Sequence, residues 1–302
     1  MGEEKENLLT IQQSPPVIDT RPMVNLPVKI PGVALKERKE AQWNTKNLVQ
    51  RILVDAACAG SAGGLVAPVI CMIDKAIIEN ASGKQPMMQS LRASMSSLLL
   101  QPHRFLTSKP FALIFMLYSG TYFAANSLDT FKSTVNNKAA SSTTSGAAKF
   151  VATSATNLSL CLYKDSQFTK LFGTVSPRPV PPVTYGLFAV RDCLTIFASF
   201  NLPPVLAPAL PLSEAAESYV SRASAAQFIA PAAIQLISTP FHLMGLDLYN
   251  RNGGTKLSDR LQKVRIDWLK SSIARMCRIV PAFGVGGVVN TSMRSRGMEA
   301  LQ

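Results

Sequence analysis

Apolar residues gather into six segments along the chain, each close in length to a membrane-spanning helix. The segments cover residues 52–73, 111–128, 147–163, 185–200, 225–248 and 273–290. A helix needs about 20 apolar residues to cross a bilayer. Charged residues concentrate between the segments and at their ends, whereas a soluble bundle would carry them along the outer faces of its helices. The pattern predicts an all-α membrane protein with six transmembrane helices, and a soluble bundle of long buried helices is the alternative.

The six segments form three pairs that recur about every 85 residues, which indicates internal repeats. In each pair the first segment is rich in small residues and ends in a polar cluster. Amphipathic helices, predicted from Met88 and from Leu257, precede the second segment of the first and third pairs. The second pair has the proline-rich run SPRPVPP from Ser176 at that place. The expected six-helix domain covers residues 48–297, and its three tandem two-helix repeats cover about 48–140, 141–220 and 221–297.

Residues 1–47 have a different character from the rest of the chain. Prolines stand at positions 15, 16, 22, 27 and 31 among charged residues, with no sustained apolar period. This composition predicts a flexible arm, which is a candidate for recruiting a protein partner. The first residues have neither the apolar core of a signal peptide nor the arginine-rich, acid-poor look of a transit peptide, so we expect any targeting signal to be internal.

The composition agrees with a membrane protein. Apolar residues make up 47% of the chain and charged residues only 16%, against about 25% charged in soluble domains. The net charge of +13 suits anionic membrane lipid or a small anionic ligand. Nucleic-acid binding is disfavoured, because the basic residues are scattered singly between apolar blocks and no recognition motif is present.

The sequence offers no motif for catalysis or for holding a cofactor or metal. The five cysteines are odd in number and form no CxxC pair, and the chain has only two histidines. Neither a nucleophile elbow nor a phosphate-binding glycine motif is found. We therefore expect a protein that is not an enzyme, with no cofactor and no metal site.

Several charged residues fall inside the apolar segments. Arg191 and Asp192 lie in the fourth segment, and the last contains Arg275 and Arg278. A guanidinium can hold a carboxylate with two hydrogen bonds, and an acidic neighbour can accept an ammonium. In a bilayer such groups must face protein or a water-filled cavity. Arg191, Asp192 and Arg278 are thus candidates for binding a small anionic or zwitterionic metabolite, or alternatively for an ion pair, such as Asp192 with Arg278, that closes the bundle.

Two further features of the apolar segments have both a functional and a packing interpretation. His242 follows Pro240 inside the fifth segment, where it could relay protons or form a hydrogen bond between helices. Gly60 and Gly64 form a GxxxG pair in the first segment, which predicts close approach of a neighbouring helix.

These features together resemble the mitochondrial carrier family over about residues 48–297. In that family each odd-numbered helix ends in a Px[DE]xx[KR] pattern, whose charged pair closes a gate on the matrix side. The chain keeps remnants of this pattern, with Asp74 and Lys75 in the first repeat and Asp247 and Arg251 in the third. The resemblance implies a gate at these residues, although the degenerate motifs weaken it.

The [FY][DE]xx[KR] pattern of the carriers' even-numbered helices is similar to the run LDTFK, where Asp129 and Lys132 are spaced i, i+3 on one helical face. The resemblance implies a second gate there, while an ordinary solvated helix end would carry the same residues.

The resemblance also implies a function. Arg191, Asp192 and Arg278 fall at the level where carriers contact their substrate. The function implied is a solute carrier of the mitochondrial inner membrane, moving a small carboxylate or an amino-acid-like metabolite by alternating access. The alternative is a carrier-derived adaptor or membrane-shaping protein that no longer transports, located in the mitochondrial outer membrane. The eroded gate motifs favour this alternative, and the charged residues inside the segments favour transport.

Overall fold

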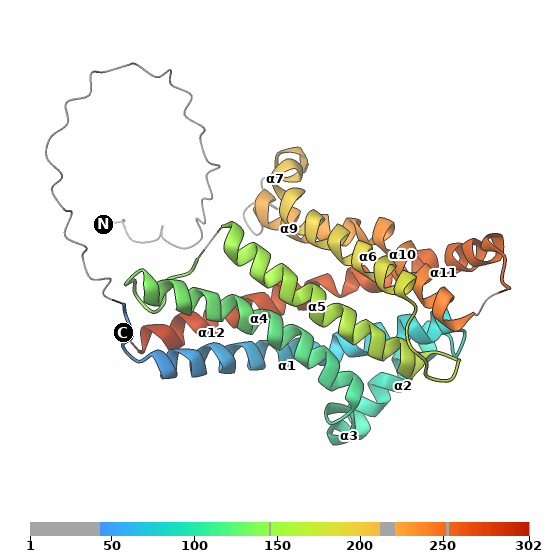
Figure 1. Cartoon of the computed structure of the whole chain (residues 1–302), viewed down its shortest axis with the longest axis horizontal. Helices are drawn as coiled ribbons and strands as arrows, with labels where there is room; N and C mark the ends of the chain where they lie inside the picture. Colours follow the sequence, from blue (N-terminus) through green and yellow to red (C-terminus); the bar gives the residue numbers. More distant parts are fainter. Residues whose placement is uncertain (1–42, 145, 212–220, 252–253, 302) are drawn as a thin grey trace, which may run out of the picture. The chain divides into compact units, whose positions relative to one another are not determined.

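The computed structural model describes residues 43–144, 146–211, 221–251 and 254–301, which belong to one compact unit, Ala41–Gln302. Every regular element in this part of the chain is a helix (Figure 1), which confirms the prediction of an all-α protein. The arm predicted for residues 1–47 lies outside the described residues, except for its last five positions, 43–47.

The helices follow one another with short connections. They are α1 (Leu48–Ser82), α2 (Met87–Leu100), α3 (Pro102–Leu106), α4 (Lys109–Val135), α5 (Ala147–Phe172), α6 (Pro182–Asn201), α7 (Pro203–Leu206), η1 (Ala207–Ala209), α9 (Arg222–Ala233), α10 (Gln235–Asn250), α11 (Leu257–Cys277), η2 (Val280–Gly286) and α12 (Gly287–Glu299).

Five helical stretches among the described residues are long and apolar enough to cross a membrane. They are Leu48–Ser82, Lys109–Val135, Pro182–Asn201, Ser224–Asn250 and Leu257–Glu299. The prediction of six spanning helices is therefore wrong by one. The segment predicted at 147–163 is the helix α5, but serine, threonine and asparagine interrupt its apolar residues. Several of these polar side chains line an internal cavity, described below, so the helix does not need a wholly apolar surface.

The predicted three tandem two-helix repeats are also not found. Between α1 and α4 lies the separate helix α2, as the repeat pattern requires. In the last pair, however, the amphipathic stretch from Leu257 continues into the final span as one helical run ending at Glu299. The run widens into the π-helical segment η2 around Pro281. Because proline has no N–H to donate, a local widening lets the run continue past it.

The long helices form a closed antiparallel ring. Each packs on the next in the order α1, α4, α5, α6, α10 and α11, and η2 and α12 return along α1 (Figure 1). The contacts of α5 with α6 set their antiparallel register, since the Tyr185 hydroxyl donates to Ser166 Oγ at 2.8 Å and the Phe150 and Phe200 rings meet at 4.5 Å. The ring brings charged residues from distant parts of the sequence together at its centre.

Glycine allows a close approach of α1 and α4. A Cβ at Gly63 would come within 2.8 Å of the Ser119 backbone nitrogen, whereas one at Gly64 would meet Phe115 at 3.7 Å. A Cβ at Gly60 would meet no described atom within 4 Å. The close packing predicted from the GxxxG pair is therefore present, but it is made by Gly63 rather than by Gly60 or Gly64.

Candidate functional site

Six charged residues meet at the centre of the ring, and we call them the central ion network. They are Asp74 on α1, Lys164 and Asp165 on α5, Arg191 and Asp192 on α6, and Arg278 at the C-terminal end of α11. Five are buried and Arg278 is partly buried. Because burying a charge is costly unless it is paired, the pairing within this network decides whether it stabilises the ring.

Asp74 and Asp165 each pair with two cations, and Asp192 accepts two hydrogen bonds from one guanidinium. Lys164 Nζ lies 2.8 Å from Asp74 Oδ2 and also contacts Asp165, and Arg278 pairs with the other oxygen of Asp74. Arg191 Nη2 lies 2.5 Å from Asp165 Oδ2. The network thus links α1, α5, α6 and α11 through charge-assisted hydrogen bonds.

Arg191 orients its neighbours on α6 and α10. It holds Asp192 with two hydrogen bonds, from Nε to Oδ1 at 2.9 Å and from Nη2 to Oδ2 at 2.6 Å. Its Nη1 lies 2.8 Å from His242 Nδ1. Since a guanidinium can only donate, His242 accepts through Nδ1 and is neutral in this structure. Of the two interpretations of His242, the structure therefore contains the hydrogen bond between helices.

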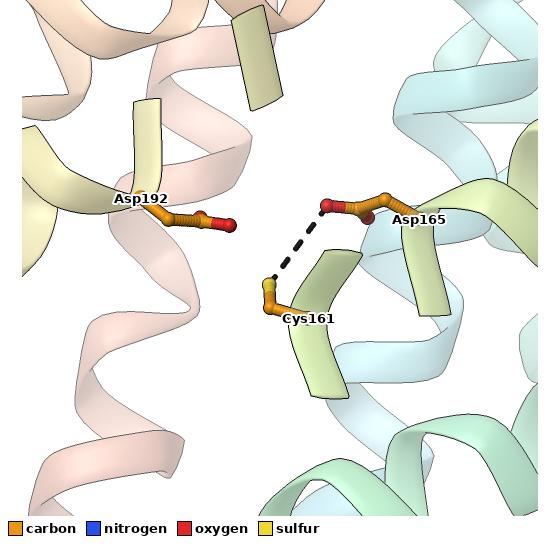
Figure 2. A group of neighbouring side chains, drawn as sticks. All are labelled: Cys161, Asp165 and Asp192. Carbon is orange, nitrogen blue, oxygen red and sulfur yellow. Dashed lines mark hydrogen bonds between the residues drawn. The ribbon is translucent and has the colours of Figure 1, made fainter. Parts of the chain in front are cut away.

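Figure 2 shows Cys161, Asp165 and Asp192 pointing toward one another from α5 and α6. Their ligand atoms all lie within 4.8 Å of one another, so they form the kind of group that can hold a metal ion. Both carboxylates are already paired with Arg191, and a cation would have to displace that guanidinium. The group therefore fits an ion-paired core better than a metal site.

A cavity of about 170 Å³ lies beside the central ion network, between α4, α5, α6, α10 and α11. On α5 its lining residues run from Thr153 to Cys161 and precede Lys164, and on α6 they run from Asp192 to Phe200. Because α5 and α6 are antiparallel, the network closes one end of the cavity. Phe200, which lines the other end, is 55% exposed.

Arg275 gives the cavity a surplus positive charge. It lines the cavity, is 3% exposed, and donates from Nε to Gln235 Oε1 at 2.9 Å. Within the described residues it forms no ion pair with a carboxylate, whereas Arg278, one turn along the helix, is paired with Asp74. A buried guanidinium without a counter-charge attracts an anionic ligand.

The rest of the lining offers neutral hydrogen-bonding groups. Asn157 donates to Thr121 Oγ1 at 3.3 Å, and Ser154 and Ser199 lie along the same walls. The hydroxyl of Thr153 is buried and has no hydrogen-bond partner. The cavity therefore combines a cation, a carboxylate and several polar groups, which suits a small zwitterion with a polar side chain.

The structure divides the three predicted substrate residues into two groups. Asp192 and Arg278 line the cavity, as a substrate site requires. Arg191 lies behind them in the central ion network, where it positions Asp192. The alternative ion pair of Asp192 with Arg278 is replaced by pairs of Asp192 with Arg191 and of Arg278 with Asp74. Arg275 was not among the predicted site residues, although its place one turn before Arg278 puts both on one face of the helix.

The charged pairs predicted as gates have other partners in the structure. Asp74 belongs to the central ion network, while Lys75 Nζ lies 5.8 Å from the ring centre of Phe172. Asp129 pairs with Lys149 at 2.6 Å rather than with Lys132. The carrier motif pairs Asp74 with Lys75 and Asp129 with Lys132, and the structure contains neither of these ion pairs among the described residues.

The third predicted pair, Asp247 with Arg251, is formed, and a further arginine joins it. Asp247 pairs with Arg251 and, at 2.6 Å, with Arg260 of α11. Arg260 also donates to the Arg251 carbonyl oxygen at 2.9 Å. These residues join the adjacent ends of α10 and α11, and a gating role for them stays a prediction.

A second buried polar layer, which the sequence did not reveal, lies toward the other end of α1. Asp55 Oδ1 accepts from Arg294 Nε at 2.7 Å, and its other oxygen accepts from the Thr130 hydroxyl at 2.5 Å. The 19 residues from Asp55 to Asp74 correspond to about 28 Å of helix. This layer ties α1, α4 and α12 together far from the central ion network.

Helices long and apolar enough to cross a bilayer, packed around a cavity with charged lining residues, define an α-helical membrane protein. A family model described as "Probable citrulline exporter" matches residues 58–298, and the chain belongs to that family. Comparison with curated proteins found no match. The resemblance to mitochondrial carriers is wrong, because the family that matches is a different one and no carrier family matches.

Proposed function

We propose that the chain moves an amino-acid-like zwitterion across a membrane, with citrulline as the first candidate, and that the substrate binds in the cavity beside the central ion network. The observation that carries this proposal is the buried Arg275, which lines the cavity without a carboxylate partner among the described residues. A transporter of amino-acid-like metabolites is what the family description suggests. An enzyme is not suggested by that description.

The three polar groups of citrulline have matching groups in the cavity. Arg275 would hold the α-carboxylate with two hydrogen bonds. Asp192, which lines the cavity from α6, would accept the α-ammonium. The uncharged ureido group would find its partners among Asn157 and the hydroxyl of Thr153.

The mechanism we propose is alternating access, with the central ion network as the closed end. A substrate ammonium at Asp192 would compete with Arg191 for the same carboxylate, and so would change how the guanidinium is shared between Asp192 of α6 and Asp165 of α5. A ligand shifts a conformational equilibrium only if it binds the two states differently. Competition for Asp192 would supply such a difference, because Arg191 holds that carboxylate in this structure.

The cavity favours transport over the non-transporting alternative. An adaptor has no use for a surplus charge buried beside a cavity, and such a charge costs stability. The predicted adaptor function of the N-terminal arm concerns residues outside the described part of the chain.

The membrane in which the protein resides is a separate matter from its transport activity. Its apolar helices support a membrane location. The mitochondrial inner membrane stays a prediction, and its first ground, the carrier resemblance, has been overturned. Fractionation of tagged protein between outer-membrane vesicles, mitoplasts and other cell membranes tests it.

The experiment that tests the function is exchange of radiolabelled L-citrulline in vesicles containing the purified full chain. We expect uptake that depends on the protein and saturates with L-citrulline. Vesicles with the protein that take up no L-citrulline or related amino acid beyond the protein-free rate would exclude the proposal.

A further inference from the structure

A second cavity, of about 150 Å³, lies on the outer side of α1, behind the short helices α2 and α3. Its lining includes Lys75, Ser94, Ser97, Arg104 and Ser108, and it shares no residue with the cavity of the central ion network. In Figure 1 the α3 segment lies at the edge of the bundle, away from α6 and α10. The two cavities are therefore separate sites.

The second cavity is positively charged. Lys75 and Arg104 line it, and no carboxylate is among its lining residues. Within the described part of the chain neither cation forms an ion pair, since Lys75 faces the Phe172 ring and Arg104 donates to Gln101. The two acids of α1 close to Lys75 in sequence have other partners. Asp74 pairs with Lys164 and Arg278, and Glu79 accepts hydrogen bonds from Ser90 and Gln85 at 2.5 Å. The charge of Lys75 thus remains available to a ligand.

Two further features of this cavity point to an anion with several oxygen atoms. Ser94 is 2% exposed and lines the cavity, yet its hydroxyl has no hydrogen-bond partner. Ser108 caps the N-terminus of α4, a helix of 27 residues whose positive end faces the same place. A buried hydroxyl left unpaired is uncommon, and a ligand oxygen would satisfy it.

Helix α2 exposes several apolar side chains, although its Leu91 and Leu98 pack against the core. Its serines at positions 90 and 94 are buried against the protein, whereas Met88, Met95 and Leu99 are exposed. An exposed apolar face on a helix next to membrane spans is typical of a helix that lies at the lipid interface. A helix lying at that interface would bring the positive cavity behind it to the depth of the lipid headgroups.

From these observations we infer that the cavity lined by Lys75, Ser94 and Arg104 binds a phosphate group, and that the headgroup of an anionic phospholipid supplies it. A phosphate accepts charge-assisted hydrogen bonds from both cations and one from the serine hydroxyl. The lipid chains would lie along the apolar face of α2. This site is independent of the proposed transport activity.

The test measures binding by the full chain in detergent, with phosphatidylglycerol, phosphatidylcholine and inorganic phosphate as separate probes. The Lys75→Gln/Arg104→Gln variant removes both cations of the cavity. The matched control, Arg92→Gln/Lys109→Gln, removes two exposed charges from α2 and α4 that do not line the cavity. Ser94→Ala removes only the unpaired hydroxyl. If the double variant does not fold, the affinity of this single variant for the lipid still tests the site.

We expect phosphatidylglycerol to bind more tightly than phosphatidylcholine, and the cavity variant to lose at least about tenfold in affinity for it. Ser94→Ala should weaken binding by several-fold, and the control should bind like the parent protein. If inorganic phosphate binds with the same dependence on these residues while phosphatidylglycerol shows no preference, the phosphate site stands and its lipid source is wrong. Equal losses in the cavity variant and the control, or no loss in either, overturn the proposal.

Discussion

The Arg275 guanidinium donates to the side-chain oxygen of Gln235 at 2.9 Å and forms no ion pair among the described residues, although both residues are buried. An amide oxygen can accept a hydrogen bond but cannot neutralise a charge. The pair therefore holds the guanidinium in place at the cavity wall while leaving its charge for a ligand. This combination of fixed orientation and free charge is what a carboxylate-binding site needs.

The first prediction concerns Arg275→Gln. Losing the partner of a buried carboxylate costs about 2 to 5 kcal/mol of binding, so L-citrulline transport in vesicles should fall at least about 30-fold. The thermal stability of the empty protein should not fall, because the variant removes an uncompensated buried charge. Arg265→Gln changes the same residue type at an exposed position of α11 and should transport like the parent. A variant at Arg275 that transports normally would exclude the residue from the site.

The second prediction separates Asp192 from a purely structural role. If Asp192 accepts the substrate ammonium, the parent protein should strongly prefer L-citrulline to N-acetyl-citrulline, which lacks that charge. Asp192→Asn should lower transport of L-citrulline and remove most of this preference. Competition by each compound against labelled citrulline measures both effects. A uniform loss of transport that leaves the preference intact would indicate that Asp192 only supports Arg191.

The third prediction concerns the substrate side chain. The cavity already has the surplus charge of Arg275, so a second cation there is repelled. Two unit charges roughly 5 Å apart repel by about 3 kcal/mol at an effective dielectric constant of about 20. L-Ornithine and L-arginine should therefore compete at least about tenfold less well than L-citrulline. Arg275→Gln should narrow this difference, and equal competition by all three amino acids in the parent protein would contradict the charge argument.

Asp165 allows a prediction about stability. It pairs with both Lys164 and Arg191 at 1% exposure, so Asp165→Asn leaves two buried cations without their shared carboxylate. We expect the variant to lose about 3 to 5 kcal/mol of stability, seen as a lower melting temperature in detergent. Asp259→Asn, at an exposed position of α11, should melt like the parent. Adding Lys164→Gln to Asp165→Asn should recover part of the loss, since it removes one of the two cations whose charge Asp165 had balanced.

The sequence was sufficient to predict which charged residues lie inside the bundle, but not which residues they pair with. Segment periodicity located Arg191, Asp192 and Arg278 inside the bundle, and the structure has them at its centre. Their pairing depends on the ring order, which brings Asp74 to Arg278 across 204 positions of the chain. No local pattern contains that contact. For the same reason the sequence could not show which of the two arginines is paired. In the structure Arg278 pairs with Asp74, and Arg275 has no carboxylate partner among the described residues.

The error in family has a related physical cause. Apolar segments with polar ends are common to helical proteins that span a membrane, and basic residues between the segments are frequent in them. These features therefore resemble many families at once. The degenerate motifs at Asp74, Asp129 and Asp247 were the specific part of the resemblance, and two of the three pairs have different partners in the structure. A short motif at a helix end thus carried less information than the match of residues 58–298 as a whole.

The last prediction concerns the packing of α1 against α4. A methyl group at Gly63 would come within 2.8 Å of the Ser119 backbone, which cannot move like a side chain, so Gly63→Ala should cost about 1 to 3 kcal/mol of stability. Gly60 is the matched control, because a methyl group there meets no described atom within 4 Å. Gly60→Ala should be neutral or stabilise by about 0.5 to 1 kcal/mol through helix propensity. Melting temperatures of the two variants in the same detergent measure the difference. If both variants melt alike, the close approach of α1 and α4 at Gly63 is not what holds this part of the ring, and the register of the two helices must differ from the one described.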